Sequence, residues 1–140
     1  MERLKIATAQ FENRSGDKTY NLSIIESLSR DAASEGAKAV AFHECSITGY
    51  TFARHLSKEQ MLDLAEFIPE GDSIKRLAEI AKEQDITILA GLFEKDKEDK
   101  VYKAYVCVNK DGLVAKFRKL HPFINPHITP GNEYLSLIHI

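Results

Sequence analysis

A predicted strand at residues 38–43, whose residues 39–42 are all apolar, is the feature that most constrains the fold of this chain. It reads Lys-Ala-Val-Ala-Phe-His, and runs of this kind are typical of strands in a sheet that is covered on both faces. Apolar residues at helical spacing precede it from Lys18 to Ala32, and Gly36 is placed to end that helix. Residues 4–11 predict a first, largely buried strand. The chain therefore begins as strand, helix, strand, which indicates an α/β protein.

Two more helices and three more strands are predicted along the chain. Ser57 and Gln60 form a capping-box pattern that opens a short helix through Ala65. A clear amphipathic helix follows, which we expect Asp72 or Ser73 to cap. The later strands are residues 86–93, 101–109 and 113–119, the last two joined by the Asp-Gly hairpin signal at 111–112. The predicted order is β-α-β-α-α-β-β-β, α/β at first and then antiparallel.

The remaining segments are predicted to be loops, with one exception. Residues 94–100 form a charged turn that we expect to be solvated, and residues 122–131 have the composition of a loop. Residues 134–140 have the pattern of one more strand. Because no repeat, linker or low-complexity tract interrupts the chain, we expect a single domain over residues 1–140.

Composition excludes several classes of function. The net charge is -2 and the basic residues are interleaved with acids, whereas nucleic-acid binding usually requires a basic stripe. The chain shows neither a signal-peptide pattern nor an apolar run long enough to cross a membrane, so we expect no membrane role and a cytoplasmic location. Two cysteines are too few for a disulfide framework, which fits a reducing compartment.

Two charged residues lie where a catalytic site is expected. Glu44 follows the apolar run, and Lys119 ends the strand predicted at 113–119. In α/β folds, side chains at the C-terminal end of a buried strand point into the crevice where ligands bind. A loop glutamate facing water, or a solvated lysine at a sheet edge, would show the same local pattern. If the two residues lie close together, however, the lysine would keep the glutamate ionised, as a base must be, and could stabilise a developing oxyanion.

Neither a metal site nor an activated thiol is indicated. His43 and Cys45 are two residues apart and share one strand face, which supplies at most two ligands, so we expect core packing rather than zinc. Cys45 adjoins Glu44, but neighbours on a strand end point in opposite directions, which disfavours proton transfer between them. Cys107 lies within an apolar strand and is predicted to be a small buried hydrophobe. Neither cysteine has the surroundings of a thiolate nucleophile.

Several segments, in this order, resemble the N-terminal half of the nitrilase, or carbon–nitrogen hydrolase, superfamily. They are Lys5–Phe11, Asn21, Ala41–Cys45 with Thr48–Tyr50, Ile88–Leu92, Phe117–His121 and Thr129–Gly131. The resemblance implies a four-layer α-β-β-α sandwich and a Glu-Lys-Cys mechanism that uses no metal or organic cofactor. It also implies that the full-length protein forms a homo-oligomer.

The resemblance assigns roles to individual residues of this chain. Glu44 matches the general base of the family, and Lys119 matches the lysine that stabilises the tetrahedral oxyanion. Tyr50 and His121 are implied to contact the substrate. The implied substrate is a small amide, carbamoyl compound or nitrile, which a cysteine thiolate attacks to form a covalent intermediate that water then releases.

The resemblance extends to about Tyr134, and the nucleophile of the family lies beyond the lysine segment. Neither Cys45 nor Cys107 occupies that position, so we expect this chain to be an incomplete sandwich and inactive by itself. Residues 135–140 fit the family poorly and are predicted to be a non-native tail. Two alternatives remain: a non-catalytic binding or assembly module that retains the half-fold, and an unrelated α/β domain that uses Cys45 as its thiol.

Overall fold

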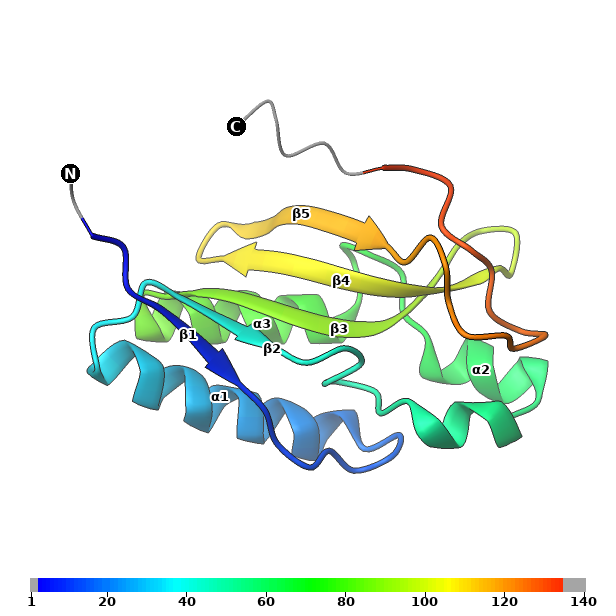
Figure 1. Ribbon diagram of the computed structural model, residues 1–140, viewed down its shortest axis with the longest axis horizontal. Coiled ribbons are helices and arrows are strands. Elements are labelled where there is room, and N and C mark those ends of the chain that lie inside the picture. The colour runs from blue at the N-terminus through cyan, green and yellow to red at the C-terminus, as the bar shows by residue number, and fades with distance from the viewer. Residues whose placement is uncertain (1–2, 135–140) are drawn as a thin grey trace.

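Five strands form one mixed sheet in the computed structural model, which describes residues 3–134 (Figure 1). The strands are β1 (Ile6–Ala9), β2 (Ala39–Phe42), β3 (Thr87–Lys95), β4 (Val101–Asn109) and β5 (Gly112–Arg118). They lie in this order across the sheet, with β1, β2 and β3 parallel and with β4 and β5 each antiparallel to its neighbour. This topology confirms the predicted change from α/β to antiparallel structure.

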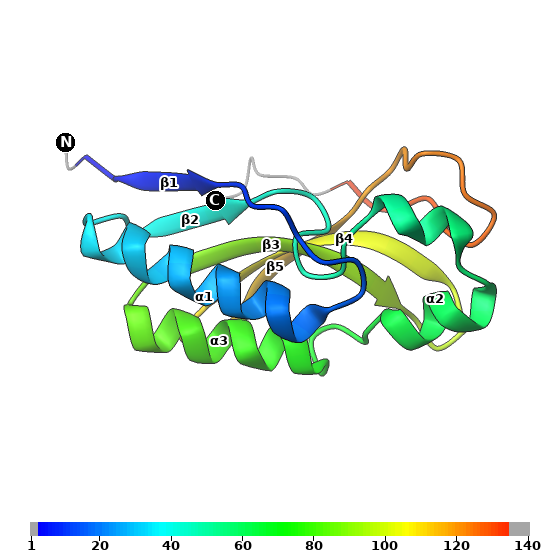
Figure 2. The ribbon, with the colours of Figure 1, turned by 90° about the horizontal axis from the view of Figure 1, so that it is seen from below.

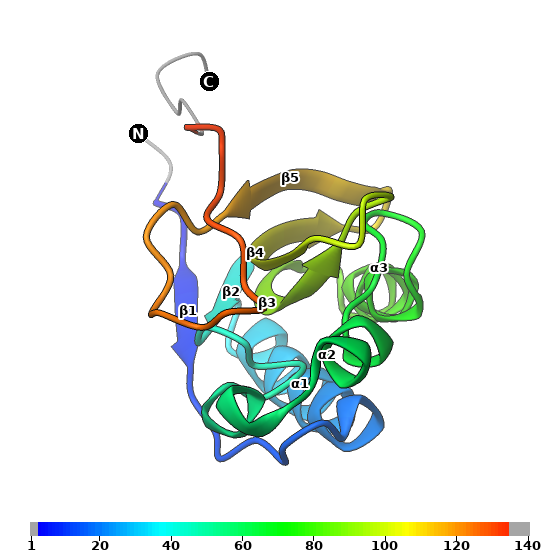
Figure 3. The same cartoon turned by 90° about the vertical axis from the view of Figure 1, so that its right-hand side faces the viewer.

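Helices α1 (Lys18–Ser34) and α3 (Asp72–Gln84) cover one face of this sheet. Helix α2 (Lys58–Leu64) and a short 3₁₀ helix at Thr51–His55 lie between them in the sequence. Figures 2 and 3 show α1 and α3 on the same face, with α2 beyond the ends of the strands. No helix of residues 3–134 covers the opposite face, so the described chain supplies two layers of the four that the resemblance implies.

The main hydrophobic core lies between the sheet and helices α1 and α3. Alternate residues of the strands point toward the helices, and Val40, Ile88 and Val106 are essentially fully buried there. Leu77 and Ile80 of α3 pack against them from the helix side. Each such side chain contributes roughly 1.5–3 kcal/mol through burial. This layer is the scaffold from which the strand ends project.

The first strand is less buried than predicted. β1 pairs only with β2 and lies at the edge of the sheet, and Ile6 is 65% exposed. The prediction of a largely buried strand is therefore wrong. The apolar residues of a strand do not reveal whether it lies at the centre or the edge of a sheet, because that depends on how many neighbours it finds.

The starts of the two later helices differ in how well local sequence predicts them. Ser57 and Gln60 form the predicted capping box at the start of α2. The prediction that Asp72 or Ser73 caps α3 is wrong, because Gly71 is the N-cap residue. The carboxylate of Glu66 accepts the backbone N–H of Ser73 at 2.9 Å and so replaces a local cap.

Glu94 is buried rather than part of a solvated turn. It lies within β3 and is 2% exposed, and its carboxylate accepts hydrogen bonds from Lys116 and Arg118 of β5. The prediction of a solvated charged segment is therefore wrong for this residue, because cross-strand cations compensate the buried charge. The turn after Asp96 is exposed, as predicted.

The chain from Lys119 to Tyr134 contains no helix or strand, which agrees with the predicted loop. Tyr134 is not in a strand, and the rest of the strand predicted at 134–140, like the predicted non-native tail, lies outside the described residues. Within the described part of the chain, no helix has the length and apolar character needed to cross a membrane.

Candidate active site

A tight turn after β2 presents Glu44. Cys45 has a φ of 53°, and the backbone N–H of Ser46 donates to the carbonyl of His43 at 3.2 Å. The N–H of Ile47 donates to the carbonyl of Gly91 on β3 at 3.0 Å. The turn is therefore attached directly to the central part of the sheet.

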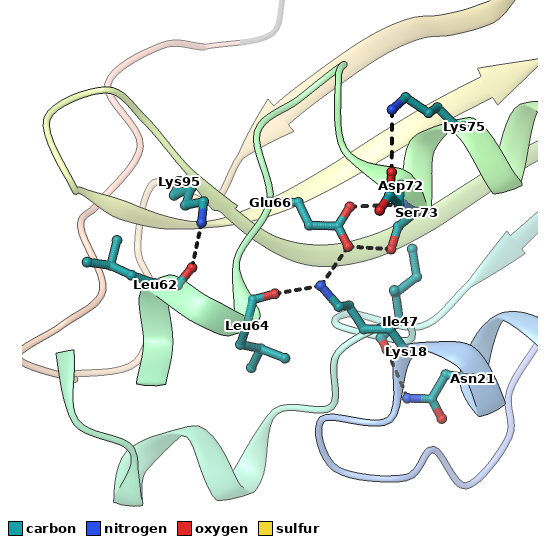
Figure 4. A network of polar contacts seen from close by, with 10 residues as sticks. All are labelled: Lys18, Asn21, Ile47, Leu62, Leu64, Glu66, Asp72, Ser73, Lys75 and Lys95. Atoms are coloured by element: carbon teal, nitrogen blue, oxygen red, sulfur yellow. Dashed lines mark hydrogen bonds and ion pairs between the residues drawn. The ribbon is translucent and has the colours of Figure 1, made fainter. Parts of the chain in front are cut away.

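Two asparagine side chains donate hydrogen bonds to this turn. Asn13 donates to the carbonyl of Cys45 at 3.2 Å. Asn21 donates to the carbonyl of Ile47 at 2.8 Å, as Figure 4 shows. Asn21 belongs to α1 and is completely buried, so its amide satisfies a buried carbonyl that would otherwise lack a partner. This contact gives a structural role to one of the residues on which the family resemblance rests.

The structure brings the two predicted catalytic residues into contact. Lys119 Nζ donates to Glu44 Oε1 at 2.7 Å, and Lys103 Nζ donates to Glu44 Oε2 at 2.9 Å. Burial alone would raise the pKa of the Glu44 carboxyl, but the hydrogen bonds and charges of Lys119 and Lys103 outweigh it and lower the pKa. The hydrogen bond to Glu44 in turn raises the pKa of Lys119. Glu44 is thus ionised at neutral pH.

Lys103 also belongs to this site, although the local sequence pattern does not single it out. Its side chain is 2% exposed, and the ring of Tyr50 lies 3.6 Å from its Nζ. The available signal is a lysine within the otherwise apolar strand Val101–Asn109. Because lysine is almost never fully buried without a partner, such a position indicates a nearby carboxylate.

A pocket of about 300 Å³ opens beside these groups. It is lined by Glu44, Lys103, Ala104, Tyr105, Phe117 and Lys119. Tyr50, predicted to contact substrate, lies at this site through its contact with Lys103. His121, predicted for the same role, is exposed and does not line this pocket.

The end of β5, which carries Lys119, is fixed on both sides. Arg118 donates two hydrogen bonds of 2.8 Å to Glu94, and its guanidinium lies 3.8 Å from the ring of Tyr102. The carbonyl of Lys119 accepts the N–H of Gly131 at 2.9 Å. A Cβ on Gly131 would lie 2.3 Å from the carbonyl oxygen of Arg118, so glycine permits this close approach. The backbone of Lys119 is therefore held in place beside Glu44.

Neither cysteine is activated as a nucleophile. Cys45 is completely buried, and burial raises the pKa of its thiol to about 12. This confirms the predicted core packing of Cys45. Cys107 is half-buried rather than buried, and burial raises the pKa of its thiol as well. His43 packs edge-on against Phe11, with ring centroids 5.0 Å apart, and burial lowers its pKa.

A second, larger pocket of about 540 Å³ lies between α1 and the start of α3. Four of its charged side chains form two ion pairs: Lys18 with Glu66, and Arg76 with Glu26, each at 2.7 Å. Figure 4 shows Lys18 and Glu66 in a network that also includes Ser73. The first pair joins α1 to the segment between α2 and α3, and the second joins α1 to α3, whereas Glu44 and Lys119 lie at strand ends beside an open pocket. The site of Glu44 and Lys119 is therefore the better candidate for a reactive site.

Comparison with known proteins places the chain in a family. Residues 5–137 match the family model described as carbon-nitrogen hydrolase. The chain is 33% identical over 120 residues to a nitrilase of Pyrococcus abyssi, covering 86% of this chain and 44% of that protein. It is 33% identical over 124 residues to the human omega-amidase NIT2, covering 88% of this chain and 42% of that protein.

Solved structures of the same fold support this placement. Nit3 of Saccharomyces cerevisiae, a member of branch 10 of the nitrilase superfamily, has a TM-score of 0.77 at 27% identity, over 93% of this chain and 49% of that one. An amidase from Nesterenkonia sp. AN1 has a TM-score of 0.74 at 20% identity, over 94% of this chain and 51% of that one. The chain thus spans about half the length of these proteins. By sequence and fold, it belongs to the carbon–nitrogen hydrolase family.

Proposed function

We propose that the protein carrying this chain hydrolyses a carbon–nitrogen bond of a small amide, carbamoyl compound or nitrile. In this proposal Glu44 is the general base and Lys119 stabilises the oxyanion. The observation that carries it is the 2.7 Å contact between Lys119 Nζ and Glu44 Oε1. This contact joins residues that are 75 apart in the sequence and that follow the ends of β5 and β2. The names of the relatives, a nitrilase and an omega-amidase, support this substrate class.

For an amide, the proposed reaction assigns each proton and electron pair. Glu44 accepts the proton of a cysteine thiol, the sulfur attacks the carbonyl carbon, and the carbonyl electron pair moves onto oxygen beside Lys119. Collapse of this intermediate breaks the carbon–nitrogen bond, and the departing amine takes the proton from Glu44. Glu44 then takes a proton from water, which attacks the thioester. The sulfur leaves with that proton, and the acid product is released.

We infer that neither Cys45 nor Cys107 supplies the thiol. A thiol with a pKa near 12 is almost entirely protonated at neutral pH, and Cys45 has no exposed surface. The 140 residues by themselves are therefore proposed to be inactive. In a mutant of the Nesterenkonia amidase, acrylamide adds to the active-site cysteine, which supports a cysteine mechanism in this fold.

Ammonia release by the full-length protein tests this proposal. The panel would contain small amides, carbamoyl compounds and nitriles, and at least one class should be hydrolysed. Glu44→Gln keeps the size of the side chain but removes the base, so we expect turnover to fall by about 10²-fold or more. Lys75→Met, at an exposed lysine that pairs with Asp72, is the control and should keep the wild-type rate.

Two results would overturn the proposal. One is a folded wild-type protein that releases ammonia from no member of the panel, which would favour a non-catalytic binding module. The other is a Glu44→Gln variant with wild-type turnover.

A further inference from the structure

The two lysines that contact Glu44 differ sharply in their surroundings. The Lys103 side chain is 2% exposed, whereas that of Lys119 is 41% exposed. Lys103 projects from within β4, and Lys119 follows the last residue of β5. They are cross-strand neighbours, because the N–H of Lys119 donates to the carbonyl of Lys103 at 2.8 Å. One carboxylate is thus shared by one buried and one half-exposed ammonium.

The ammonium of Lys103 has few alternatives to Glu44. Within residues 3–134, its one hydrogen bond is the 2.9 Å contact to Glu44 Oε2, and the Tyr50 ring lies 3.6 Å away. Moving a buried ammonium away from its counter-charge would leave an uncompensated charge in a low-dielectric environment. The cation–π contact with Tyr50 adds to the attraction that holds it. Lys103 is therefore held close to Oε2.

Lys119 can move at much lower cost. Nearly half of its side chain faces water, so solvent can replace the hydrogen bond to Glu44 Oε1 when the ammonium moves. Its backbone stays in place through the hydrogen bonds to Lys103 and Gly131. The flexible side chain can therefore turn toward the pocket while its Cα remains at the strand end.

We propose that Lys103 is a positioning residue, which holds Oε2 of Glu44 so that Lys119 can leave Oε1 to meet the oxyanion. This inference rests on the proposed function, in which Glu44 is the base. Once Lys119 moves, Oε1 is free to accept the thiol proton, and Oε2 stays anchored. Without Lys103, the carboxylate would be free to follow Lys119 toward the pocket, and proton acceptance and oxyanion stabilisation would compete for the same lysine.

The net charge of the site supports this division of roles. The charged groups that face Glu44 are Lys103, on β4, and Lys119, which follows β5. The titratable residues Cys45 and Tyr50 lie in the same loop as Glu44. One carboxylate and two ammoniums leave one net positive charge at neutral pH. When Glu44 accepts the thiol proton it becomes neutral, and the negative charge passes to the sulfur and then to the oxyanion, so this net charge does not change. Lys119 can then pair with the oxyanion, while Lys103 still donates to Oε2 and keeps the carboxyl group in place.

Titration of the Glu44 carboxyl carbon by NMR tests the pairing without requiring turnover. In Lys103→Met we expect its pKa to rise by about one pH unit or more, because an opposite charge is lost. In Lys75→Met, which removes an exposed lysine that pairs with Asp72, the pKa of Glu44 should not change. An unchanged Glu44 pKa in folded Lys103→Met would overturn the inference.

Hydrogen exchange of the lysine ammonium groups can be measured in the wild-type chain. It therefore tests the different roles of Lys103 and Lys119 even if Lys103→Met does not fold. The Lys103 ammonium should exchange at least about tenfold more slowly than that of Lys119, because it is buried and paired. Equal exchange rates would overturn the proposed division of roles.

Turnover of the full-length Lys103→Met variant separates a positioning role from a structural one. We expect kcat to fall by about tenfold or more with little change in KM, and the acid limb of the pH profile to shift upward with the pKa of Glu44. A wild-type pH profile in this variant would contradict the positioning role. Failure of the wild-type protein to hydrolyse any substrate would instead overturn the proposed function, and the NMR titration would still decide whether Lys103 holds Glu44.

Discussion

Gly91 lies so close to Cys45 that a Cβ on Gly91 would be 2.3 Å from the Cys45 amide nitrogen. The carbonyl of Gly91 accepts the N–H of Ile47 at 3.0 Å, and its own N–H donates to Ser46 Oγ at 3.3 Å. The turn that presents Glu44 therefore rests on the backbone of β3. A residue without a side chain is required at this point of contact.

Gly91→Ala tests this contact. We expect it to lower the free energy of unfolding by about 1–3 kcal/mol and to shift the NMR signals of the turn, since the new methyl group meets backbone atoms. Urea denaturation measures the first effect. Val114→Ala, at a β5 side chain that is 57% exposed, is the control and should stay within about 0.5 kcal/mol of wild type. An alanine variant with wild-type stability and unchanged signals would show that the turn does not depend on this approach.

Glu94→Gln tests the buried charge cluster that fixes the end of β5. Its carboxylate accepts charge-assisted hydrogen bonds from Arg118 and Lys116, so we expect the free energy of unfolding at neutral pH to fall by about 2 kcal/mol. Urea denaturation at neutral pH measures this difference. A variant as stable as wild type would contradict the structural role of the cluster.

The same cluster predicts a pH dependence of stability. Burial alone would raise the pKa of Glu94, but the hydrogen bonds from Arg118 and Lys116 lower it below its ordinary value. A carboxyl whose pKa is lower in the folded chain stabilises it above the unfolded pKa, about 4.3 for glutamate, and this stabilisation disappears as pH falls through the folded value. Between about pH 5 and pH 3, wild type should therefore lose stability more steeply than Glu94→Gln. Parallel curves would contradict this assignment.

The fold features that depend on nearby residues are predictable from the sequence. The Ser57–Gln60 capping box and the Asp-Gly hairpin each require residues only a few positions apart, and the structure has both. The approach of Glu44 to Lys119 is predictable for a related reason. Each residue directly follows a strand-like run, and strand ends that meet at one edge of a sheet bring such residues together.

Features that depend on distant partners are not predictable in this way. Glu94 lies in a charged stretch, but its partners on β5 come 22 and 24 residues later. The partner of Lys103 is Glu44, which precedes it by 59 residues. Ile6 reads as a core residue until the sheet order shows that β1 has only one neighbour. In each case the register and order of the strands, not the local pattern, decide burial.

Substituting two lysines compares a buried ion pair with an exposed one. Lys18 donates to Glu66 at 2.7 Å, and both side chains are largely buried, whereas Lys75 and Asp72 are 65% and 97% exposed. We expect Lys18→Met to lower the free energy of unfolding by about 2 kcal/mol, since Glu66 would lose its counter-charge. Lys75→Met should change it by less than about 0.5 kcal/mol. Equal effects of the two substitutions in urea denaturation would contradict this role of the network in Figure 4.

Iodoacetamide labelling followed by mass spectrometry tests the assignment of Cys45. Its thiol has no exposed surface and a pKa near 12, so in the folded chain we expect it to react only as fast as the chain opens. Cys107, which is half-buried, should react first. Rapid labelling of Cys45 at neutral pH, together with amide turnover by these residues alone, would instead support a thiol enzyme centred on Cys45.

The most direct test of the central claim is the turnover of Glu44→Gln, Lys119→Met and the double variant in the full-length protein. If base and lysine act as one catalytic unit, each single substitution should lower kcat by about 10²-fold or more, and the double variant should be little slower than either. Wild-type turnover in either folded single variant, or losses that multiply in the double variant, would contradict the account.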